Sequence, residues 1–410
     1  MTRKNRRLVK NRTQRKSTTS QLSSKNIHFL KKSWQSICKY KAVPCPNHAP
    51  IQDSDIQHIQ KTGMYPHIPG KIRQLFESSQ HQGIKCETEL LRGRKVVIYI
   101  ASSQQVDVDI YLNNILAWLN FISDVASHSC AQTLNVYLLL TDAKKRLPEI
   151  DTEPIDQIHA NTAFTTSCSS MNDIFVYRQE EWFKVFMHET FHCFGLDFSS
   201  SNGDESNSRI LSLFPALNPS IDIRLYETFC EMWGEVFHLL FCLFTDKNGK
   251  GRPFSEAKFY KALIKEQRFS IYQSNKILRR AGYKYRELFS EPLDKSSKYK
   301  ENTPAFSYYV IKSLLLWNLD KFMNWCFKYS EKDPIQFNQK YIAEYCDLVE
   351  YLTAHDGGYA KIVERTIPFS TPYGRQSGNS PNAVSKKLRG GGTPDISETL
   401  RMTAVDPKWY

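Results

Sequence analysis

The first 52 residues contain no aspartate or glutamate, although they hold thirteen of the 55 Lys and Arg residues. The remaining 42 basic residues equal the 42 acidic ones, so the formal net charge of +13 belongs to this arm. We predict that residues 1–52 are disordered, because their charge opposes packing. The arm could contact nucleic acid, direct nuclear import or virion packaging, or simply keep the protein soluble. The neutral remainder excludes a general attraction of the folded body for polyanions.

Long apolar runs are also missing. No apolar stretch of signal-peptide length follows the basic residues, and the stretches 237–244 and 311–319 are too short or interrupted to cross a bilayer. We therefore expect a protein that is made in the cytosol, is not secreted and has no membrane span. The ten cysteines lack regular spacing, which indicates reduced thiols rather than a disulfide scaffold. Cys38, Cys45 and His48 are the one candidate metal cluster among them, and three scattered ligands argue against it.

Glycine and proline are scarce across the middle of the chain and gather near its C-terminus. Residues 356–410 become rich in Pro, Gly, Ser and Thr, and we predict a disordered tail there. Within it, Leu-Arg-Gly-Gly-Gly at 388–392 resembles the C-terminal tail of ubiquitin-like proteins and the Gly-Gly sites cut by viral processing proteases. A flexible glycine run is the simpler interpretation.

The middle of the chain has the apolar content of a folded core. Residues 96–101 and 134–141 read as buried strands, and the intervening 108–127 reads as a helix. A strand–helix–strand unit predicts that the two strands are parallel. Residues 161–166 and 173–177 could form a hairpin at the edge of the same sheet. We therefore predict an α+β fold, with a small mixed sheet followed by helices from 222 onwards.

The most informative segment reads His188-Glu189-Thr190-Phe191-His192. On a helix, residues four apart lie on one face, so both imidazoles can bind one Zn²⁺ while Glu189 polarises a metal-bound water. Two acids at 180–181 suit the first turn of such a helix, and Gly195 suits its end. Because the surrounding residues are almost all apolar, the alternative is a buried helix with two hydrogen-bonded histidines.

A third ligand must come from elsewhere in the chain. The apolar helix predicted over 222–244 carries Glu227, Glu231, Glu235 and His238 in one polar stripe. Carboxylates on so apolar a helix are costly unless they are paired or bind a metal, although the stripe could also face solvent.

This arrangement resembles the zincin metallopeptidases, and in particular their gluzincin branch, over about residues 85–250. The resemblance implies a two-lobed catalytic core in which a single Zn²⁺ is bound by His188, His192 and Glu227, with Glu231 supporting a ligand histidine from the outer shell. It also implies an edge strand that holds a peptide substrate. Gly195, however, lies three residues after the second histidine, and a glycine at this position is typical of the metzincin branch. Asp197 is therefore the alternative third ligand, one residue short of that branch's ligand position.

The gluzincin resemblance further implies a histidine or tyrosine that stabilises the transition state, and no motif identifies it. The candidates are Tyr226, His238, Tyr283 and Tyr285. The sequence around the motif, IFVYRQEEWFKVFMHETFHCFGLDFS, also resembles proteins of large nucleocytoplasmic DNA viruses that are identified as zinc peptidases. That resemblance implies a virion or an infected cell, including its nucleus, as the setting.

Five regions follow from these patterns: the arm 1–52, a connecting segment 53–84, the zincin-like catalytic core 85–250, a helical subdomain 251–355 and the tail 356–410. The predicted function is zinc-dependent hydrolysis of protein or peptide substrates, with Glu189 as the general base. The alternative is a non-catalytic protein with a vestigial peptidase fold, which binds zinc or, through the arm, nucleic acid.

Overall fold

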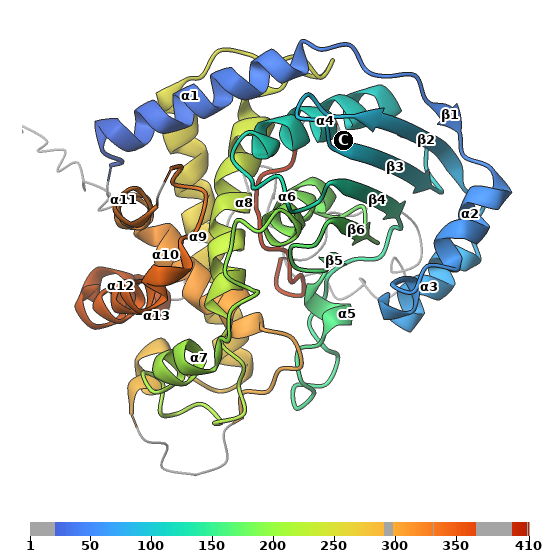
Figure 1. Ribbon diagram of the computed structural model, residues 1–410. Helices are drawn as coiled ribbons and strands as arrows, with labels where there is room; N and C mark the ends of the chain where they lie inside the picture. Colours follow the sequence, from blue (N-terminus) through green and yellow to red (C-terminus); the bar gives the residue numbers. More distant parts are fainter. Residues whose placement is uncertain (1–20, 291–297, 331, 366–395, 408, 410) are drawn as a thin grey trace, which may run out of the picture.

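A computed structural model describes residues 21–290, 298–330, 332–365, 396–407 and 409 (Figure 1). One mixed sheet of six strands has the order β1-β2-β3-β4-β6-β5. Strands β3, β4 and β6 are parallel, while β1, β2 and β5 run antiparallel to their neighbours. The strands are β1 (Ala49–Pro50), β2 (Gln82–Glu89), β3 (Lys95–Ser102), β4 (Thr133–Leu140), β5 (Ala163–Thr165) and β6 (Met171–Val176).

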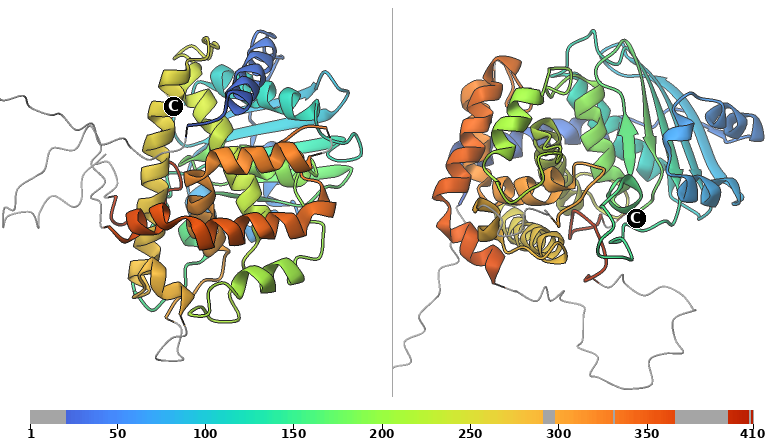
Figure 2. Two further views of the ribbon diagram at one scale, coloured as in Figure 1. Left: turned by 90° about the vertical axis from the view of Figure 1, so that its left-hand side faces the viewer. Right: turned by 90° about the horizontal axis from the view of Figure 1, so that it is seen from below.

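Helices cover both faces of this sheet (Figures 1 and 2). The α-helices of the described chain are α1 (Ser24–Lys41), α2 (Asp53–Gln60), α3 (Gly70–Glu77), α4 (Val108–Ser123), α5 (Gln157–Ala160), α6 (Trp182–Cys193), α7 (Asp204–Leu211), α8 (Leu225–Phe244), α9 (Glu256–Arg280), α10 (Lys312–Trp317), α11 (Leu319–Tyr329), α12 (Ile342–His355) and α13 (Gly357–Glu364). Shorter or irregular turns are the 3-10 helices η1 (Tyr65–His67), η2 (Tyr285–Phe289) and η4 (Gln339–Tyr341), and the π-helix η3 (Phe306–Ile311). The predicted combination of a mixed sheet with many helices is therefore confirmed.

The predicted strand–helix–strand unit is formed by β3, α4 and β4, and its two strands are parallel. Alternate residues of these strands point to opposite faces, and both faces are buried. Ile98 and Val136 join the main core with α4, α6 and α8, whereas Tyr99 and Tyr137 pack under α2 and α3. The edge hairpin is also confirmed, because β5 pairs with β6 antiparallel and has no further strand beyond it in the described chain.

The prediction that residues 1–52 are disordered is wrong for α1. Ser23 caps this helix by accepting a hydrogen bond from the Asn26 amide, and Leu30, Trp34 and Ile37 are buried against the core. These three apolar residues recur at helical spacing, and burying them outweighs the surrounding positive charge. The connecting segment 53–84 likewise contains α2, α3 and the start of β2. Residues 1–20 lie outside the described chain, so the nucleic-acid contact stays a prediction.

The prediction of a disordered tail over 356–410 is also wrong in two places. Helix α13 occupies Gly357–Glu364, and residues 396–407 form an irregular segment, with a turn at 396–398 and bends at Met402 and Ala404, that enters the core. Leu400 and Thr403 in this segment are completely buried. The glycine run 388–392 lies outside the described residues. Low local hydrophobicity predicted disorder, but residues of the body supply the partners that the segment lacks within itself.

One disulfide corrects the prediction of reduced thiols. Cys130 and Cys168 are bonded, while the other eight cysteines are free. The two turns that carry them are adjacent, since the Ala131 amide donates to the Ser169 carbonyl. Among the described residues, Cys38, Cys45 and His48 do not form one of the groups whose ligand atoms converge. In the same residues, no helix is long and apolar enough to cross a membrane.

Candidate metal centre

Helix α6 carries the two-histidine motif and is buried along its whole length. Gly195 ends the turn after it with φ +64, the left-handed conformation predicted for this position. The two acids expected in its first turn lie just before it instead, because the helix begins at Trp182. Glu181 is buried with φ +59 and forms an ion pair of 2.8 Å with Lys145, while Glu180 accepts the Lys145 amide. They hold the start of α6 in place from within the core.

Three ligand atoms converge between α6 and α8. His188 Nε2 lies 3.0 Å from His192 Nε2 and 3.0 Å from Glu227 Oε2, and His192 Nε2 lies 3.4 Å from the same oxygen. Each of the three residues is at most 9 % exposed. Three atoms at these separations can all lie about 2.0–2.2 Å from one Zn²⁺, and two nitrogens with one carboxylate oxygen form a donor set that zinc accepts.

The other nitrogen of each histidine faces an acid. Glu231 Oε1 lies 3.0 Å from His188 Nδ1, and Asp197 Oδ2 lies 2.5 Å from His192 Nδ1. Such outer acids fix which nitrogen carries the proton and orient the ring toward a metal. Asp197 is therefore placed as an outer partner of His192 and not among the three converging ligand atoms. Asp197 is only 4 % exposed, although the residues that follow it in the sequence are mostly polar.

The polar stripe of α8 points into the protein, so the solvent-facing alternative is excluded. Glu231 pairs with Lys184 of α6, and Glu235 accepts a hydrogen bond of 2.9 Å from Lys312. His238 Nε2 lies 3.0 Å from the Val405 carbonyl oxygen. These buried carboxylates avoid the desolvation cost of an isolated charge because each has a cationic partner.

The hydrogen-bonded acids set the charge of the metal-free histidines. Burial opposes protonation of His188, but its contacts with Glu227 and Glu231 outweigh it and raise its pKa to about 9. The pKa of His192 is raised well above its usual value too, because the nearby thiol of Cys230 and the acids Asp197 and Glu227 outweigh burial. The pKa values of Glu227 and Glu231 are correspondingly lowered. A metal that binds here must displace a proton from the histidines.

Glu189 lies beside these ligands at a narrow cavity of about 20 Å³, which has room for about one water molecule. The cavity is lined by Lys145, Ala160, Asn161, Thr162, Ala163, Val185, His188, Glu189, Glu231, Tyr308 and Met402. Burial raises the pKa of Glu189, which makes it a better proton acceptor than an exposed carboxylate.

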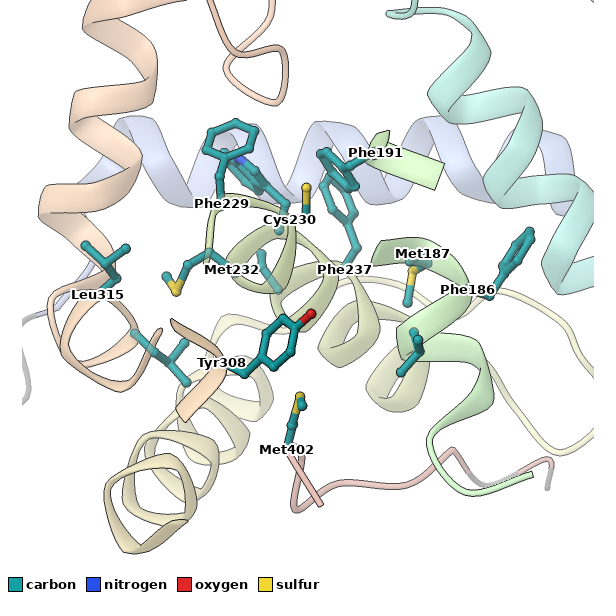
Figure 3. Packing of buried hydrophobic residues seen from close by; sticks show 14 of the residues in the cluster. Phe186, Met187, Phe191, Phe229, Cys230, Met232, Phe237, Tyr308, Leu315 and Met402 are labelled. Atoms are coloured by element: carbon teal, nitrogen blue, oxygen red, sulfur yellow. The ribbon is translucent and has the colours of Figure 1, made fainter. Parts of the chain in front are cut away.

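Tyr308 is a site residue that the sequence did not reveal. It lies on the π-helix η3, its ring centroid is 6.3 Å from that of His188, and it lines the same cavity as Glu189. Figure 3 shows its ring beside Met402, with the hydroxyl directed toward α6 and α8. In the sequence, FSYYVI looks like any apolar helical core, so no local signal distinguishes this tyrosine.

The four residues named from the sequence as candidates for stabilising the transition state are less favourably placed than Tyr308. The ring of Tyr226 is 6.0 Å from that of His192 and remains near the site. His238 contacts the Val405 carbonyl, and the Tyr283 hydroxyl donates to the Ala216 carbonyl. The ring of Tyr285 packs edge-on against Phe289 and Tyr359. Only Tyr226 therefore remains beside Tyr308 as a donor candidate.

A second convergent group shares one ligand with the first. Cys230 Sγ lies 3.6 Å from Asp197 Oδ2 and 3.8 Å from His192 Nδ1. Because all three meet on the outer side of the His192 ring, this group supports the ring and does not face the cavity at Glu189.

Comparison of the chain with known proteins found no matching family model, no matching curated protein and no matching solved structure.

Proposed function

We propose that this protein is a zinc-dependent peptidase. The observation that carries the proposal is the convergence of His188 Nε2, His192 Nε2 and Glu227 Oε2 beside the carboxylate of Glu189. Three protein ligands and one open position are typical of catalytic zinc, whereas structural zinc usually has four protein ligands. Asp197 and Glu231 are the nearest further acids, and both are engaged at the outer nitrogens of the histidines, which leaves the fourth position open.

Zinc, when bound, supplies a Lewis acid that makes water acidic enough to be deprotonated near neutral pH. Glu189 accepts the proton of the attacking water and delivers it to the amine that leaves the cleaved peptide bond. Its buried position favours this role, because a carboxylate with a raised pKa is the stronger base. The hydroxyl of Tyr308 is the best-placed donor for the negative charge that develops on the carbonyl oxygen.

The edge of the sheet suits an extended peptide substrate. Strand β5 has a free edge in the described chain, and Asn161, Thr162 and Ala163 at its start line the cavity at Glu189. A peptide that adds to this edge would bring its backbone past the general base, and its hydrogen bonds would be independent of side-chain identity. Since the cavity admits about one water, the substrate must displace side chains from its wall as it binds.

The non-catalytic alternative is favoured by one observation, the narrowness of this cavity. Metal analysis and peptide cleavage separate the two functions. We expect one zinc per chain, cleavage of a peptide library, loss of cleavage with a chelator and recovery with added zinc. A protein that binds one zinc but cleaves no peptide would favour the alternative. A metal content far below one per chain that zinc addition does not restore would contradict both.

A further inference from the structure

The C-terminal segment 396–407 is held in the protein like a bound peptide. It forms no strand of the sheet, and its only β-bridge in the described chain joins Thr399 to Arg146. Instead, side chains of the body bind its backbone from several helices at once. In Figure 1 the segment, drawn in dark red, runs beside α8. In Figure 3 its residue Met402 lies next to Tyr308.

Two buried carboxylates receive the amides of the segment. Glu181 Oε1 accepts hydrogen bonds of 2.8 and 2.7 Å from the amides of Met402 and Thr403. Glu266 accepts the Ala404 amide at 2.9 and 2.8 Å, and also the Thr403 hydroxyl at 2.9 Å. Three consecutive amides are thus bound by side chains that belong to α9 and to the residue preceding α6.

Donors of the body meet the carbonyl groups in the same way. Lys312 Nζ donates to the Met402 carbonyl at 3.0 Å, and Lys265 Nζ donates to the Ala404 carbonyl at 2.7 Å. Further donors reach the carbonyls of neighbouring residues of the segment: Tyr309 at Leu400, Gln273 at Arg401 and His238 at Val405. Hydrogen bonds to both amides and carbonyls of a segment are the way proteins recognise peptides through their main chain.

The charges that bind the segment have partners of their own in the body. Glu181 pairs with Lys145 at 2.8 Å, and Lys312 pairs with Glu235 at 2.9 Å. Arg401 of the segment also lies 3.8 Å from Glu181. Glu181 and Lys312 nevertheless each have one partner outside the segment that holds them in position. Groups that are held in position in this way are expected of a binding site.

We propose that these side chains form a peptide-binding groove, that the C-terminal segment occupies it as an exchangeable ligand, and that occupancy strengthens metal binding at the neighbouring site. The regulatory part of this inference rests on the proposed zinc site, whereas the binding part does not. The ligand class is a peptide with the sequence of residues 396–407.

Met402 connects the groove to the metal centre. Its side chain lines the cavity at Glu189, and its sulfur lies 3.6 Å from Lys184 Nζ. Lys184 pairs with Glu231, which in turn lies 3.0 Å from His188 Nδ1. The segment thereby limits the positions that Lys184 can adopt and keeps Glu231 directed at the histidine. An empty groove would loosen this contact and weaken zinc binding by about tenfold, as loss of an outer-shell partner does.

The Thr403→Pro variant of the full chain tests the binding part, because it removes an amide that donates to Glu181 and leaves every groove residue unchanged. A fluorescent peptide of residues 396–407 should bind this variant without zinc, whereas the same peptide with proline at position 403 should not. The matched Thr403→Ser variant keeps the amide and a hydroxyl, so its own C-terminal segment should still occupy the groove. The added peptide should therefore not bind to this variant. Absence of peptide binding to a folded Thr403→Pro variant would overturn the proposal.

Zinc titration of the same variant tests the regulatory part. We expect its zinc affinity to fall by about tenfold and to recover when the unlabelled peptide is added. If the peptide binds but zinc affinity does not change, the proposed coupling is wrong, whereas the proposed peptide-binding groove is still supported. If zinc binds neither the parent nor the variant, the proposed function fails, and the peptide-binding result still stands.

Hydrogen exchange of the unchanged full chain remains informative even if Thr403→Pro does not fold. An exchangeable segment should open without global unfolding, so the amides of Met402, Thr403 and Ala404 should exchange together and faster than those of α8. If these three amides exchange only at the rate of global unfolding, the segment is a fixed part of the core and the proposal is wrong.

Discussion

Asp197 Oδ2 lies 2.5 Å from His192 Nδ1, on the opposite side of the ring from the nitrogen that faces Glu227. Glu231 has the equivalent position at His188. The two histidines therefore have one acid each at their outer nitrogens and share Glu227 at their inner ones. The three acids therefore occupy different positions around the histidines, which spacing in the sequence left open.

Replacing these acids should separate the two roles. Glu227→Ala removes a ligand and should lower zinc affinity by more than about 100-fold, whereas Asp197→Ala removes only ring support and should lower it by about 10–100-fold. The exposed Asp204→Ala is a matched control and should leave affinity unchanged. Zinc titration with a competing chelator measures all three. A greater loss in Asp197→Ala than in Glu227→Ala would assign the third ligand to Asp197.

The Glu189→Gln variant should retain one zinc and lose turnover by about 10²–10⁴-fold, because it removes the proton acceptor without removing a ligand. Glutamine also preserves the size of a side chain that is only 6 % exposed. Metal analysis and peptide cleavage on the same preparation provide the comparison. Equal rates in the parent and the variant would show that Glu189 is not the general base.

Tyr308→Phe should lower kcat by about 10²–10³-fold with little change in KM, because only the transition state needs the hydroxyl. Tyr226→Phe is the matched comparison, since that ring also lies near the histidines. Steady-state kinetics of the two variants decide between them. The assignment moves to Tyr226 if its variant has the larger loss in kcat.

The metal-free protein should lose stability as the pH rises. The pKa of His188 is raised to about 9 in the folded protein and is about 6.5 when unfolded, so protonation stabilises the fold most below pH 6.5. This contribution, at most roughly 3 kcal/mol, disappears as the pH passes through about 9. Urea unfolding of chelator-treated protein at pH 6.5 and 9.5 measures it, and His188→Asn should reduce the difference. Zinc affinity should change in the opposite sense and increase up to about pH 9.

Gly195→Ala should destabilise the protein by about 1 kcal/mol or more, because φ is +64 and an added Cβ would lie 2.8 Å from Cys130 Sγ. Gly203→Ala is the matched control, since φ there is −87 and the nearest atom to an added Cβ is 3.9 Å away. Thermal unfolding should give a lower Tm for the first variant only. Equal Tm values for both would show that the helix end tolerates a side chain.

The sequence by itself determined the elements with strong local patterns. The spacing of His188 and His192 on an apolar helix, the left-handed Gly195 and the parallel strand–helix–strand unit all follow from periodicity and steric rules. The apolar helix around them indicated that the acids of the 222–244 stripe need partners, and the gluzincin resemblance selected Glu227 among them. In the structure Glu227 lies beside both histidines, and its role as a metal ligand stays a prediction.

Only the tertiary structure decided which residues far apart in the chain meet. Asp197 was only the alternative third ligand in the sequence, and Tyr308 looked like ordinary core, whereas packing places both beside the histidines. The segment 396–407 looked disordered because its partners lie in helices 90 or more residues away. Local composition describes what a segment can bury within itself, whereas its final order depends on hydrogen bonds and charges supplied by the rest of the fold.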